Sequence, residues 1–456
     1  MSATRYASVH GLGFGDCGKG HFIDALTRRW QAHTIVRCNG GAQAGHNVVL
    51  AGSRSSSGIH HTFSQFGAGT FVPQVHTLLL NPMVVHPTAV LVEAERLTTL
   101  GMNDALLRLH IDARCLVTTP FHQAAGRLRE LLRGANPHGT CGVGVGETVR
   151  YSLEHPYESL RYGDLLPDTR SRATALLDQI EAIRRRLLTE FSERCTDGSP
   201  EAVSDDFRLL QDESVSAIWL AQARALARQS PPEALDQMST RLTQPGCVLV
   251  EGAQGVLLDE WHGFHPHTTW SSIQTVAVED AVRSLGISTS FEHYGVLRTY
   301  LTRHGAGPFP TEDIALDPLL PEPHNSPEGF QGKFRRGHPD AVLWRYAIGS
   351  VGPLSGLLLS HLDVFDRGVA LKWCESYLVP SGVGHAQTVQ HLPVAGTRDL
   401  AKQEELTRWL KTVTPRYKST PVRSALEFRE CLRTVTSLPV LLGSYGPTSN
   451  DVGPFG

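Results

Sequence analysis

The apolar residues of the chain fall into short continuous runs and into longer stretches with helical spacing. The short runs are typical of strands that are buried on both faces, and Gly, Pro, Asn or Asp follows most of them closely. They occupy residues 7–10, 34–37, 77–80, 106–111, 248–250, 294–297, 356–359 and 440–442. Amphipathic stretches such as residues 89–100 and 340–348 lie between them. This alternation predicts an α/β fold with a mainly parallel central sheet flanked by helices.

One region departs from the alternation. In residues 167–243 apolar side chains recur at helical spacing, from Ala173 to Leu188 and again from Val215 to Leu226. We interpret this region as a helical insertion within a single domain spanning residues 1–456, and not as a separate catalytic domain. Residues 316–332 are rich in Pro, Glu, Gly and Asn, which predicts a long mobile loop.

Composition and charge are those of an ordinary globular protein. The 456 residues are 41% hydrophobic and 19% charged, and 42 basic side chains nearly balance 45 acidic ones. The resulting net charge of −3 gives no sign of a surface for nucleic acid. The eight cysteines form no CxxC pair, the N-terminus has no apolar signal core, and no apolar run reaches membrane-spanning length. We therefore expect a cytoplasmic protein without nucleic-acid or membrane partners.

The most informative motif is the glycine-rich segment GFGDCGKG at residues 13–20. Its glycines allow backbone N–H groups to close on an anion, and the helix predicted to follow adds its positive end. The spacing up to Lys19 is that of a Walker A loop, but Gly20 stands where that motif has Ser or Thr. A Mg²⁺ ion would lack its usual hydroxyl ligand, and Asp16 could supply a carboxylate oxygen instead. The alternative is a glycine-rich turn with one unrelated lysine.

Several further segments combine glycine with polar residues near the ends of predicted strands. They are residues 39–47, 139–146, 251–255, 303–312 and 362–366. Each alone could be a turn. Together they predict a large site lined by backbone N–H groups and small side chains, which suits a nucleotide.

In their order along the chain these segments resemble the adenylosuccinate synthetase family. The most specific matches are GDCGKG at residues 15–20 (GDEGKG in the family), GGxxAGH ending at His46, EGAQGxLLD at residues 251–259 and GAGPFPTE at residues 305–312. Members of this family join aspartate to IMP while hydrolysing GTP. The resemblance implies a P-loop-like α/β ligase that forms a C–N bond, needs Mg²⁺, and works as a homodimer on GTP, an IMP-like nucleotide and an aspartate-like amino acid.

The chemistry of such a ligase gives the matching residues their roles. The oxygen of a 6-oxopurine leaves poorly, so it must first become a phosphate ester, and a base that removes the N1 proton makes it a nucleophile. By resemblance Asp16 is that base and also a Mg²⁺ ligand, together with the carbonyl group of Gly41. Lys19 neutralises phosphate oxygens, His46 offsets charge on the β–γ bridge, and Gln254 completes the catalytic set. A lone loop histidine is more often structural, but the GGxxAGH string favours catalysis.

The resemblance also assigns two nucleotide subsites. For the purine monophosphate it implies Asp16, Gln43, Thr140, Cys141, Arg150, Gln254 and Thr269. Cys141 stands where the family has threonine, and Arg150 lies near the position of an arginine that the family takes from the partner subunit. For GTP it implies Gly15, Gly18, Lys19, Gly20, Asp363, Ser444, Gly446 and Pro447. Asp363 would accept hydrogen bonds from guanine, and His361 replaces a family lysine.

The amino-acid loop departs most from the family, which uses two threonines, a glycine and several arginines. Here residues 330–336 read FQGKFRR, so only Lys333, Arg335 and Arg336 are cationic. A lysine does not reproduce the bidentate grip of an arginine on a carboxylate. The loop still predicts a dicarboxylate binder. We expect aspartate as its substrate, with a weaker KM than the usual loop gives.

Two alternatives to the assigned reaction stay open. The first is a paralogue that acts on dGMP, dIMP or an analogue, or with another amino acid. Residues 446–452 are similar to phage 2-aminoadenylosuccinate synthases, which use dGMP and ATP, but those enzymes lack the aspartates found here at Asp16 and Asp363. The second is a nucleotide-binding regulatory protein without catalysis, which the retained Asp16, Lys19, His46 and Gln254 disfavour. A generic P-loop NTPase is excluded because no Ser or Thr follows Lys19.

Overall fold

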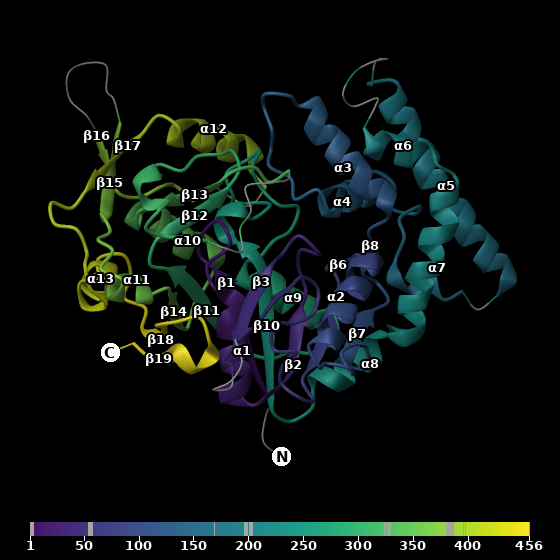
Figure 1. Cartoon of the computed structure of the whole chain (residues 1–456), viewed down its shortest axis with the longest axis horizontal. Coiled ribbons are helices and arrows are strands. Elements are labelled where there is room, and N and C mark those ends of the chain that lie inside the picture. The colour runs from purple at the N-terminus through teal and green to yellow at the C-terminus, as the bar shows by residue number, and fades with distance from the viewer. Residues whose placement is uncertain are drawn as a thin grey trace.

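A ten-stranded sheet runs through the middle of the molecule (Figure 1). The computed structural model describes residues 4–52, 58–167, 169–195, 199, 204–322, 325, 330–379, 387–394, 396 and 398–455. Neighbouring strands of the sheet are parallel except β18 and β19, which confirms the predicted mainly parallel sheet. In sheet order the strands are β19 (Val452–Pro454), β18 (Val440–Ser444), β14 (Gly356–Ser360), β11 (Glu292–Arg298), β1 (Arg5–Gly11), β10 (Cys247–Gly255), β2 (Ala32–Arg37), β5 (His76–Leu79), β7 (Leu109–Asp112) and β9 (Pro232–Glu233).

Helices cover both faces of this sheet. Within the described residues they are α1 (Lys19–Trp30), α2 (Pro87–Thr99), α3 (Pro120–Leu132), α4 (Val145–Glu154), α5 (Arg170–Ser192), α6 (Asp205–Gln211), α7 (Ser214–Gln229), α8 (Leu235–Leu242), α9 (Thr275–Arg283), α10 (Ala341–Val351), α11 (Asp363–Asp366), α12 (Leu400–Leu410) and α13 (Ala425–Leu432). None of them is long and apolar enough to cross a membrane.

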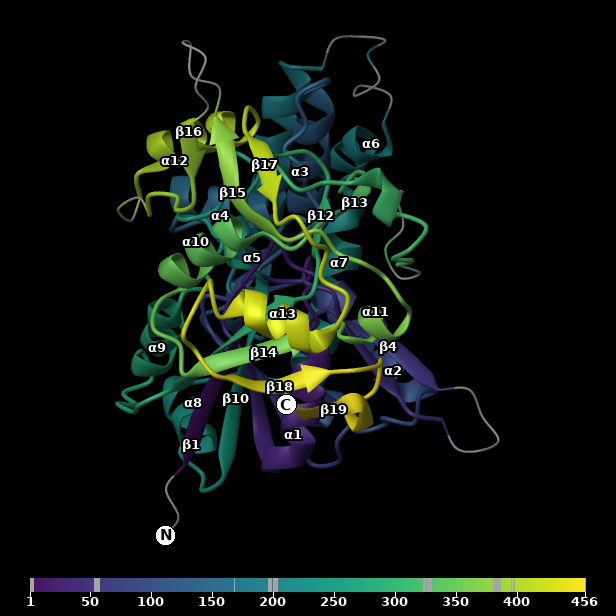
Figure 2. The ribbon, with the colours of Figure 1, turned by 90° about the vertical axis from the view of Figure 1, so that its left-hand side faces the viewer.

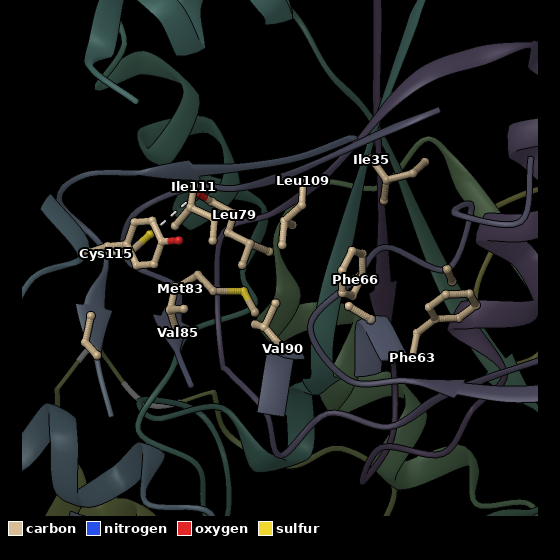
Figure 3. Close-up of a cluster of buried hydrophobic side chains, with 14 of the residues drawn as sticks. Ile35, Phe63, Phe66, Leu79, Met83, Val85, Val90, Leu109, Ile111 and Cys115 are labelled. Atoms are coloured by element: carbon tan, nitrogen blue, oxygen red, sulfur yellow. Dashed lines mark hydrogen bonds between the residues drawn. The ribbon is translucent and has the colours of Figure 1, made fainter. Parts of the chain in front are cut away.

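Successive side chains of the central strands point to opposite faces of the sheet and contribute to two separate hydrophobic cores. Ile35 and Leu79 face one side of the sheet, where they pack with α1, α2 and the helices beyond them. Val36 and Leu78 face the other side, where they meet α8 and α9. Figure 3 shows the first core, in which Ile35 and Leu79 lie near other buried side chains of the sheet and of α2. Burial on both faces explains why these strands are continuous apolar runs.

Helices α5, α6, α7 and α8 fall within the predicted helical insertion, and the helical layer is larger than predicted. Helices α3 and α4 precede that segment; α3 packs with α5 and α6, and α4 packs with α3 (Figure 1). Inside the segment, Pro232 and Glu233 leave the helices and pair as β9 with β7. Strand β9 therefore returns the chain to the main sheet from within the helical segment.

One predicted strand is partly wrong. Residues 106–108 form a turn of 3₁₀ helix, and the strand β7 begins only at Leu109. Leu107 is 74% exposed and points into solvent, so the apolar run is not buried along its whole length. Of the predicted mobile loop at residues 316–332, residues 323–324 and 326–329 lie outside the described part of the chain.

The C-terminal half builds a third core around α10 and adds small sheets. Trp344 of α10 packs edge-on against Trp373 and Phe428 of α13. Figure 2 shows α13 beside β14 and β18. The small sheets are β3 (His46–Leu50) with β4 (Ile59–Phe63), β6 (Val84–Val85) with β8 (Leu116–Val117), β12 (Leu301–His304) with β13 (Phe334–Gly337), and β15 (Cys374–Val379) with β16 (Gln387–Val389) and β17 (Thr414–Tyr417).

Candidate functional site

A cavity of about 610 Å³ opens where the parallel strands of the sheet end. The residues at or just after the carboxyl ends of β1, β2, β10, β11, β14 and β18 line it, and this is the edge at which open α/β sheets bind ligands. Fourteen of the predicted site residues line the cavity: Gly15, Asp16, Gly18, Lys19, Gly20, Gln43, His46, Cys141, Gln254, Thr269, Asp363, Ser444, Gly446 and Pro447.

The loop after β1 has the shape of an anion-binding loop. Gly15 and Gly18 adopt left-handed φ angles of 88° and 87°, and Gly18 is the N-terminal cap of α1. Lys19 is buried, yet no described carboxylate lies within 4.0 Å of its ammonium group, whose polar contact is Cys17 Sγ at 3.8 Å. A buried ammonium without a counter-ion, at the start of a helix, indicates that an anion is its partner.

The close approach of α1 and β3 explains why glycine replaces the Walker A hydroxyl residue. A Cβ atom at Gly20 would lie 2.8 Å from the Cβ of His46, so Ser or Thr would clash there. His46 is buried, and its two ring nitrogens face the Glu251 carboxylate and, at 2.9 Å, the Ala253 carbonyl oxygen. Burial lowers the pKa of His46, and Glu251 opposes that shift. Glu251 belongs to the EGAQG motif, but its contact with His46, 205 residues away, was not predicted from the sequence.

Asp16 projects from the loop into the cavity. Its backbone has a φ of 46°, which is unusual for a residue other than glycine. Its Oδ2 lies 3.6 Å from Nε2 of His304, and its carbonyl oxygen accepts a hydrogen bond of 2.8 Å from Arg298. Among the described residues only Glu322 and Asp363 also bring carboxylates to the lining. Of these three carboxylates, Asp16 is the one that belongs to the anion-binding loop, three residues before Lys19.

Two glutamines present unsatisfied amide groups to the cavity. Gln254 donates a hydrogen bond of 2.7 Å to the Ser271 carbonyl oxygen, but its own Oε1 is buried without a partner. Both polar atoms of the Gln43 amide are likewise buried and unpartnered. A buried amide without a partner costs free energy, on the order of 1–3 kcal/mol. These groups indicate that a polar ligand completes their hydrogen bonds.

The other predicted residues for the purine nucleotide are not all brought together. Thr269 and Cys141 line the cavity, and Cys141 Sγ accepts a hydrogen bond of 2.8 Å from Gln331. Burial raises the pKa of the Cys141 thiol to about 11, which keeps it protonated at neutral pH. Thr140 is outside the lining, where its hydroxyl oxygen accepts a hydrogen bond of 3.2 Å from the Gly142 amide.

Arg150 also lies outside the lining. It belongs to α4, where its guanidinium group is 2.9 Å from Glu147, 2.7 Å from Glu154 and 3.6 Å from Glu190. These contacts within one chain leave its predicted role in a neighbouring subunit untested.

The far end of the cavity contains the residues predicted to read guanine. Asp363 begins α11, and its carboxylate lies 3.3 Å from Arg367. Ser444 accompanies it in the lining, where its hydroxyl group donates to the Gly446 carbonyl oxygen at 3.0 Å. His361 has a φ of 61°, and burial lowers its pKa well below the ordinary value. Asp363 brings a carboxylate to this part of the lining.

The predicted amino-acid residues lie just behind the cavity. Lys333 and Arg336 turn toward Asp317, at 3.9 Å and 3.0 Å, and Arg335 pairs with Glu312 at 2.7 Å. Arg335 stands directly across the β12–β13 hairpin from Arg303, which does line the cavity.

Arg303 is the cationic residue of this hairpin that reaches the lining, and sequence reasoning missed it. Its guanidinium group is buried over the ring of Phe14 and donates a hydrogen bond of 3.0 Å to the Pro308 carbonyl oxygen. No carboxylate of the described residues lies within 4.0 Å of it. Burial and the neighbouring Arg335 lower its pKa. Of these two neighbouring guanidinium groups only Arg335 has a described carboxylate within 4.0 Å, that of Glu312, and the remaining positive charge favours an anionic ligand. Arg303 opens the quoted segment 303–312, so the signal was present in the sequence.

The metal ligands predicted from the sequence are only partly in the lining. Among the described residues no three His, Cys, Asp or Glu side chains form a metal cluster. Asp16 lines the cavity, whereas the Gly41 carbonyl oxygen lies outside the lining and accepts a hydrogen bond of 3.3 Å from the Ala44 amide. A Mg²⁺ ion shared with nucleotide phosphates commonly takes one or two carboxylates, so a single aspartate fits such an ion.

The sheet edge, the anion-binding loop and the unsatisfied amides define a nucleotide-binding α/β enzyme. A family model described as adenylosuccinate synthetase matches residues 8–452. The chain is 32% identical over 449 residues to an adenylosuccinate synthetase of Edwardsiella ictaluri, covering 97% of this chain and 96% of that protein. It is 33% identical over 466 residues to one of Shewanella halifaxensis, covering 98% of each. The chain belongs to the adenylosuccinate synthetase family, whose members are C–N ligases.

Solved structures agree on the fold. The fully ligated adenylosuccinate synthetase from Plasmodium falciparum superposes with a TM-score of 0.74 at 19% identity, covering 98% of this chain and 99% of that one. The succinoaminodeoxyadenylate synthetase of cyanophage S-2L, bound to dGMP and dATP, superposes with a TM-score of 0.59 at 15% identity, covering 100% and 96%. The predicted α/β architecture is confirmed.

Proposed function

We propose that this chain joins aspartate to C6 of IMP, in a GTP- and Mg²⁺-dependent reaction that passes through a 6-phosphoryl intermediate. The observation that carries the proposal is a set of groups around one cavity: Asp16, Lys19, His46, the unpartnered amide of Gln43 and the unpartnered Oε1 of Gln254. A base, a phosphate-neutralising cation and free purine-binding amides are the groups that phosphoryl transfer to a purine oxygen requires.

The first step is assigned to Asp16. Its carboxylate takes the N1 proton of IMP, the electron pair moves to O6, and O6 attacks the γ-phosphorus of GTP while the bond to the β–γ bridging oxygen breaks. The products of this step are GDP and 6-phosphoryl-IMP. The amine of aspartate then attacks C6, and the C6–O6 bond breaks with release of inorganic phosphate and a proton from the amine. Gln43 and Gln254 would orient the purine through their free amide atoms.

Lys19 and His46 would stabilise the charge that moves to GDP. Lys19 is buried in the loop, and no carboxylate of the described residues lies within 4.0 Å of its ammonium group to compete with the phosphates. His46 lies against Gly20 and is held by Glu251, close to the point where the β–γ bridge would break. Mg²⁺ would be held by the carboxylate of Asp16, the phosphates and, as the resemblance implies, the Gly41 carbonyl, and it would supply further charge neutralisation.

An isotope experiment tests the 6-phosphoryl route. When IMP carries ¹⁸O at O6 and the enzyme turns over with GTP, Mg²⁺ and aspartate, each inorganic phosphate released should contain one ¹⁸O atom. Phosphate without the label would mean that water attacks GTP directly, which would contradict the assigned chemistry.

We predict that Asp363 selects guanine over adenine. Its carboxylate would accept from N1–H and the 2-amino group of guanine, whereas adenine presents an acceptor at N1. A hydrogen bond to a charged group contributes about 1.5–3 kcal/mol. Asp363→Asn should therefore reduce the preference for GTP over ATP in kcat/KM by about 10- to 100-fold. Asp366→Asn changes an exposed carboxylate of the same short helix and should leave the preference intact. Equal use of ATP and GTP by the unmodified protein would show that Asp363 does not read the base.

We infer that Arg303 and Arg335 together receive the carboxylates of the amino acid. Arg335→Ala should raise KM for aspartate about 10- to 100-fold, the loss expected for one charge-assisted contact, and should leave KM for GTP nearly unchanged. Arg336→Ala should have a much smaller effect, because that guanidinium group is directed to Asp317 and the Leu320 carbonyl oxygen. Steady-state kinetics in which each substrate is varied in turn measures KM for aspartate and KM for GTP in both variants. If Arg335→Ala weakens only nucleotide binding, the placement of the amino acid is wrong.

We further infer that the protein works as a cytoplasmic homodimer. Helix α4 carries Arg150 and leaves Leu153 67% exposed, and Tyr157 just beyond it is 98% exposed. These side chains would be covered if α4 met a second copy, and Arg150 could then approach the neighbouring site. Light scattering on the purified protein distinguishes a dimer from a monomer.

A further inference from the structure

Arg298, which lines the cavity, contacts the backbone of the loop that carries Asp16. Arg298 ends β11, is 4% exposed, and donates a hydrogen bond of 2.8 Å from Nη1 to the carbonyl oxygen of Asp16. Asp16 is the described non-glycine residue of this loop with a left-handed φ, 46°, a conformation that needs support from its surroundings. Arg298 supplies such support.

Arg298 is itself held by two other groups. Its Nη2 donates to the hydroxyl oxygen of Tyr300 and to the carboxylate of Glu322, and its guanidinium carbon lies 4.1 Å from the centre of the Tyr300 ring. The Tyr300 hydroxyl group donates a further hydrogen bond of 2.9 Å to Glu322. Glu322 therefore holds both Arg298 and Tyr300 in place.

His304 makes a second contact with Asp16, at its carboxylate. His304 Nε2 lies 3.6 Å from Asp16 Oδ2 and 3.3 Å from Oδ1 of Asn325, which stands three residues after Glu322. Glu322 and Asn325 are thus linked to Asp16, the first through Arg298 to its backbone and the second through His304 to its carboxylate. Cys17 is the next residue of the loop, and its carbonyl oxygen accepts a hydrogen bond of 2.8 Å from Ser360 Oγ. Side chains therefore hold the backbone at two successive carbonyl groups, those of Asp16 and Cys17.

We propose that Arg298 is a positioning residue for the proposed reaction: by holding the Asp16 carbonyl oxygen it directs the Asp16 carboxylate to the purine, and Glu322 and Tyr300 hold Arg298 in place. This inference rests on the proposed function of Asp16 as the base. A base displaced by about 1 Å can lose on the order of 10²-fold in rate while the substrates still bind. Phosphoryl transfer therefore depends on Glu322, although Glu322 belongs to the segment leading to the amino-acid loop.

The test compares Arg298→Met, Arg298→Lys and Glu322→Gln with the unmodified protein. The matched control is Arg184→Met in α5, away from the cavity. Arg184 is also buried, donates a hydrogen bond of 2.9 Å to the Leu210 carbonyl oxygen and pairs with Glu181. Thermal melting monitors folding, and steady-state kinetics gives kcat and each KM. Positional isotope exchange of ¹⁸O in GTP, with IMP present and aspartate absent, measures phosphoryl transfer alone.

We expect Arg298→Met to lower kcat and the isotope exchange at least tenfold, with KM for GTP, IMP and aspartate changed less than about threefold. Arg298→Lys should recover part of the rate, and Glu322→Gln should lower the exchange to a smaller extent. Arg184→Met should lower the melting temperature but not kcat.

Several results would overturn the inference. A folded Arg298→Met with full kcat, an effect on KM alone, or an equal loss of kcat in Arg184→Met would each do so. If Arg298→Met does not fold, unchanged exchange in Glu322→Gln, which keeps shape and volume, would overturn it instead. If the unmodified protein shows neither exchange nor turnover, the proposed function fails, and that result is distinct from all of these.

Discussion

Asp16→Asn should nearly abolish turnover while the protein stays folded. The amide keeps the size of the carboxylate but cannot take the N1 proton of the purine. Loss of a general base typically costs about 10²- to 10⁴-fold in rate, and loss of a Mg²⁺ ligand adds to that. Initial rates of GDP formation with all three substrates at saturation measure the change.

The control for this prediction is Asp366→Asn, a change of the same kind on an exposed carboxylate outside the cavity lining. It should retain the full rate, and both variants should melt close to the unmodified protein. Asp16→Asn with most of its kcat would remove Asp16 from the role of base. The inference about Arg298 would then lose its foundation as well.

Lys19→Met should produce the second large loss. Its ammonium group is buried, with no described carboxylate within 4.0 Å, so the phosphates of GTP are its expected partners. Removal of one preorganised group that stabilises developing charge typically costs about 10²- to 10³-fold in kcat. Methionine fills a similar volume, which keeps the start of α1 packed.

This loss should appear in the same isotope exchange that monitors phosphoryl transfer. KM for aspartate should be nearly unchanged, since the amino acid is expected at the other side of the cavity, near Arg303. A Lys19→Met variant that loses aspartate binding and keeps phosphoryl transfer would contradict the assignment of the loop to GTP.

The sequence predicted well which loop residues line the cavity, because their placement depends on backbone geometry. Gly18 needs its left-handed φ of 87° at the start of α1, and Gly20 must lack a side chain because His46 packs against it. Requirements of this kind restrict a position to glycine and leave a recognisable spacing. The buried strands were predictable for a similar reason, since both of their faces are apolar.

The placement of the cationic side chains predicted to bind the amino acid was less predictable, because it depends on strand register and on which way side chains point. Arg335 and Arg336 are neighbours in β13, and neighbouring strand residues face opposite sides, so only Arg335 lies across from Arg303. Composition alone ranked Lys333, Arg335 and Arg336 equally. The partnership of Glu251 with His46 joins residues 205 positions apart, and no local pattern encodes it.

The predicted helical insertion shows the limit of periodicity. Helical spacing identified α5 and α7 correctly, but it could not show that α3 and α4 join the same layer or that β9 returns to the sheet. Those are properties of packing between segments, and they depend on which apolar faces meet.

The central claim is the identity of the reaction, and product analysis tests it most directly. Purified protein should be offered IMP, dIMP, GMP and dGMP, each with aspartate or other amino acids and with GTP or ATP, and the products identified by mass spectrometry. We predict one main product, adenylosuccinate, from IMP, aspartate and GTP, with one GDP and one phosphate formed for each molecule. A main product from dGMP and ATP, or no condensation product from any combination, would contradict the account.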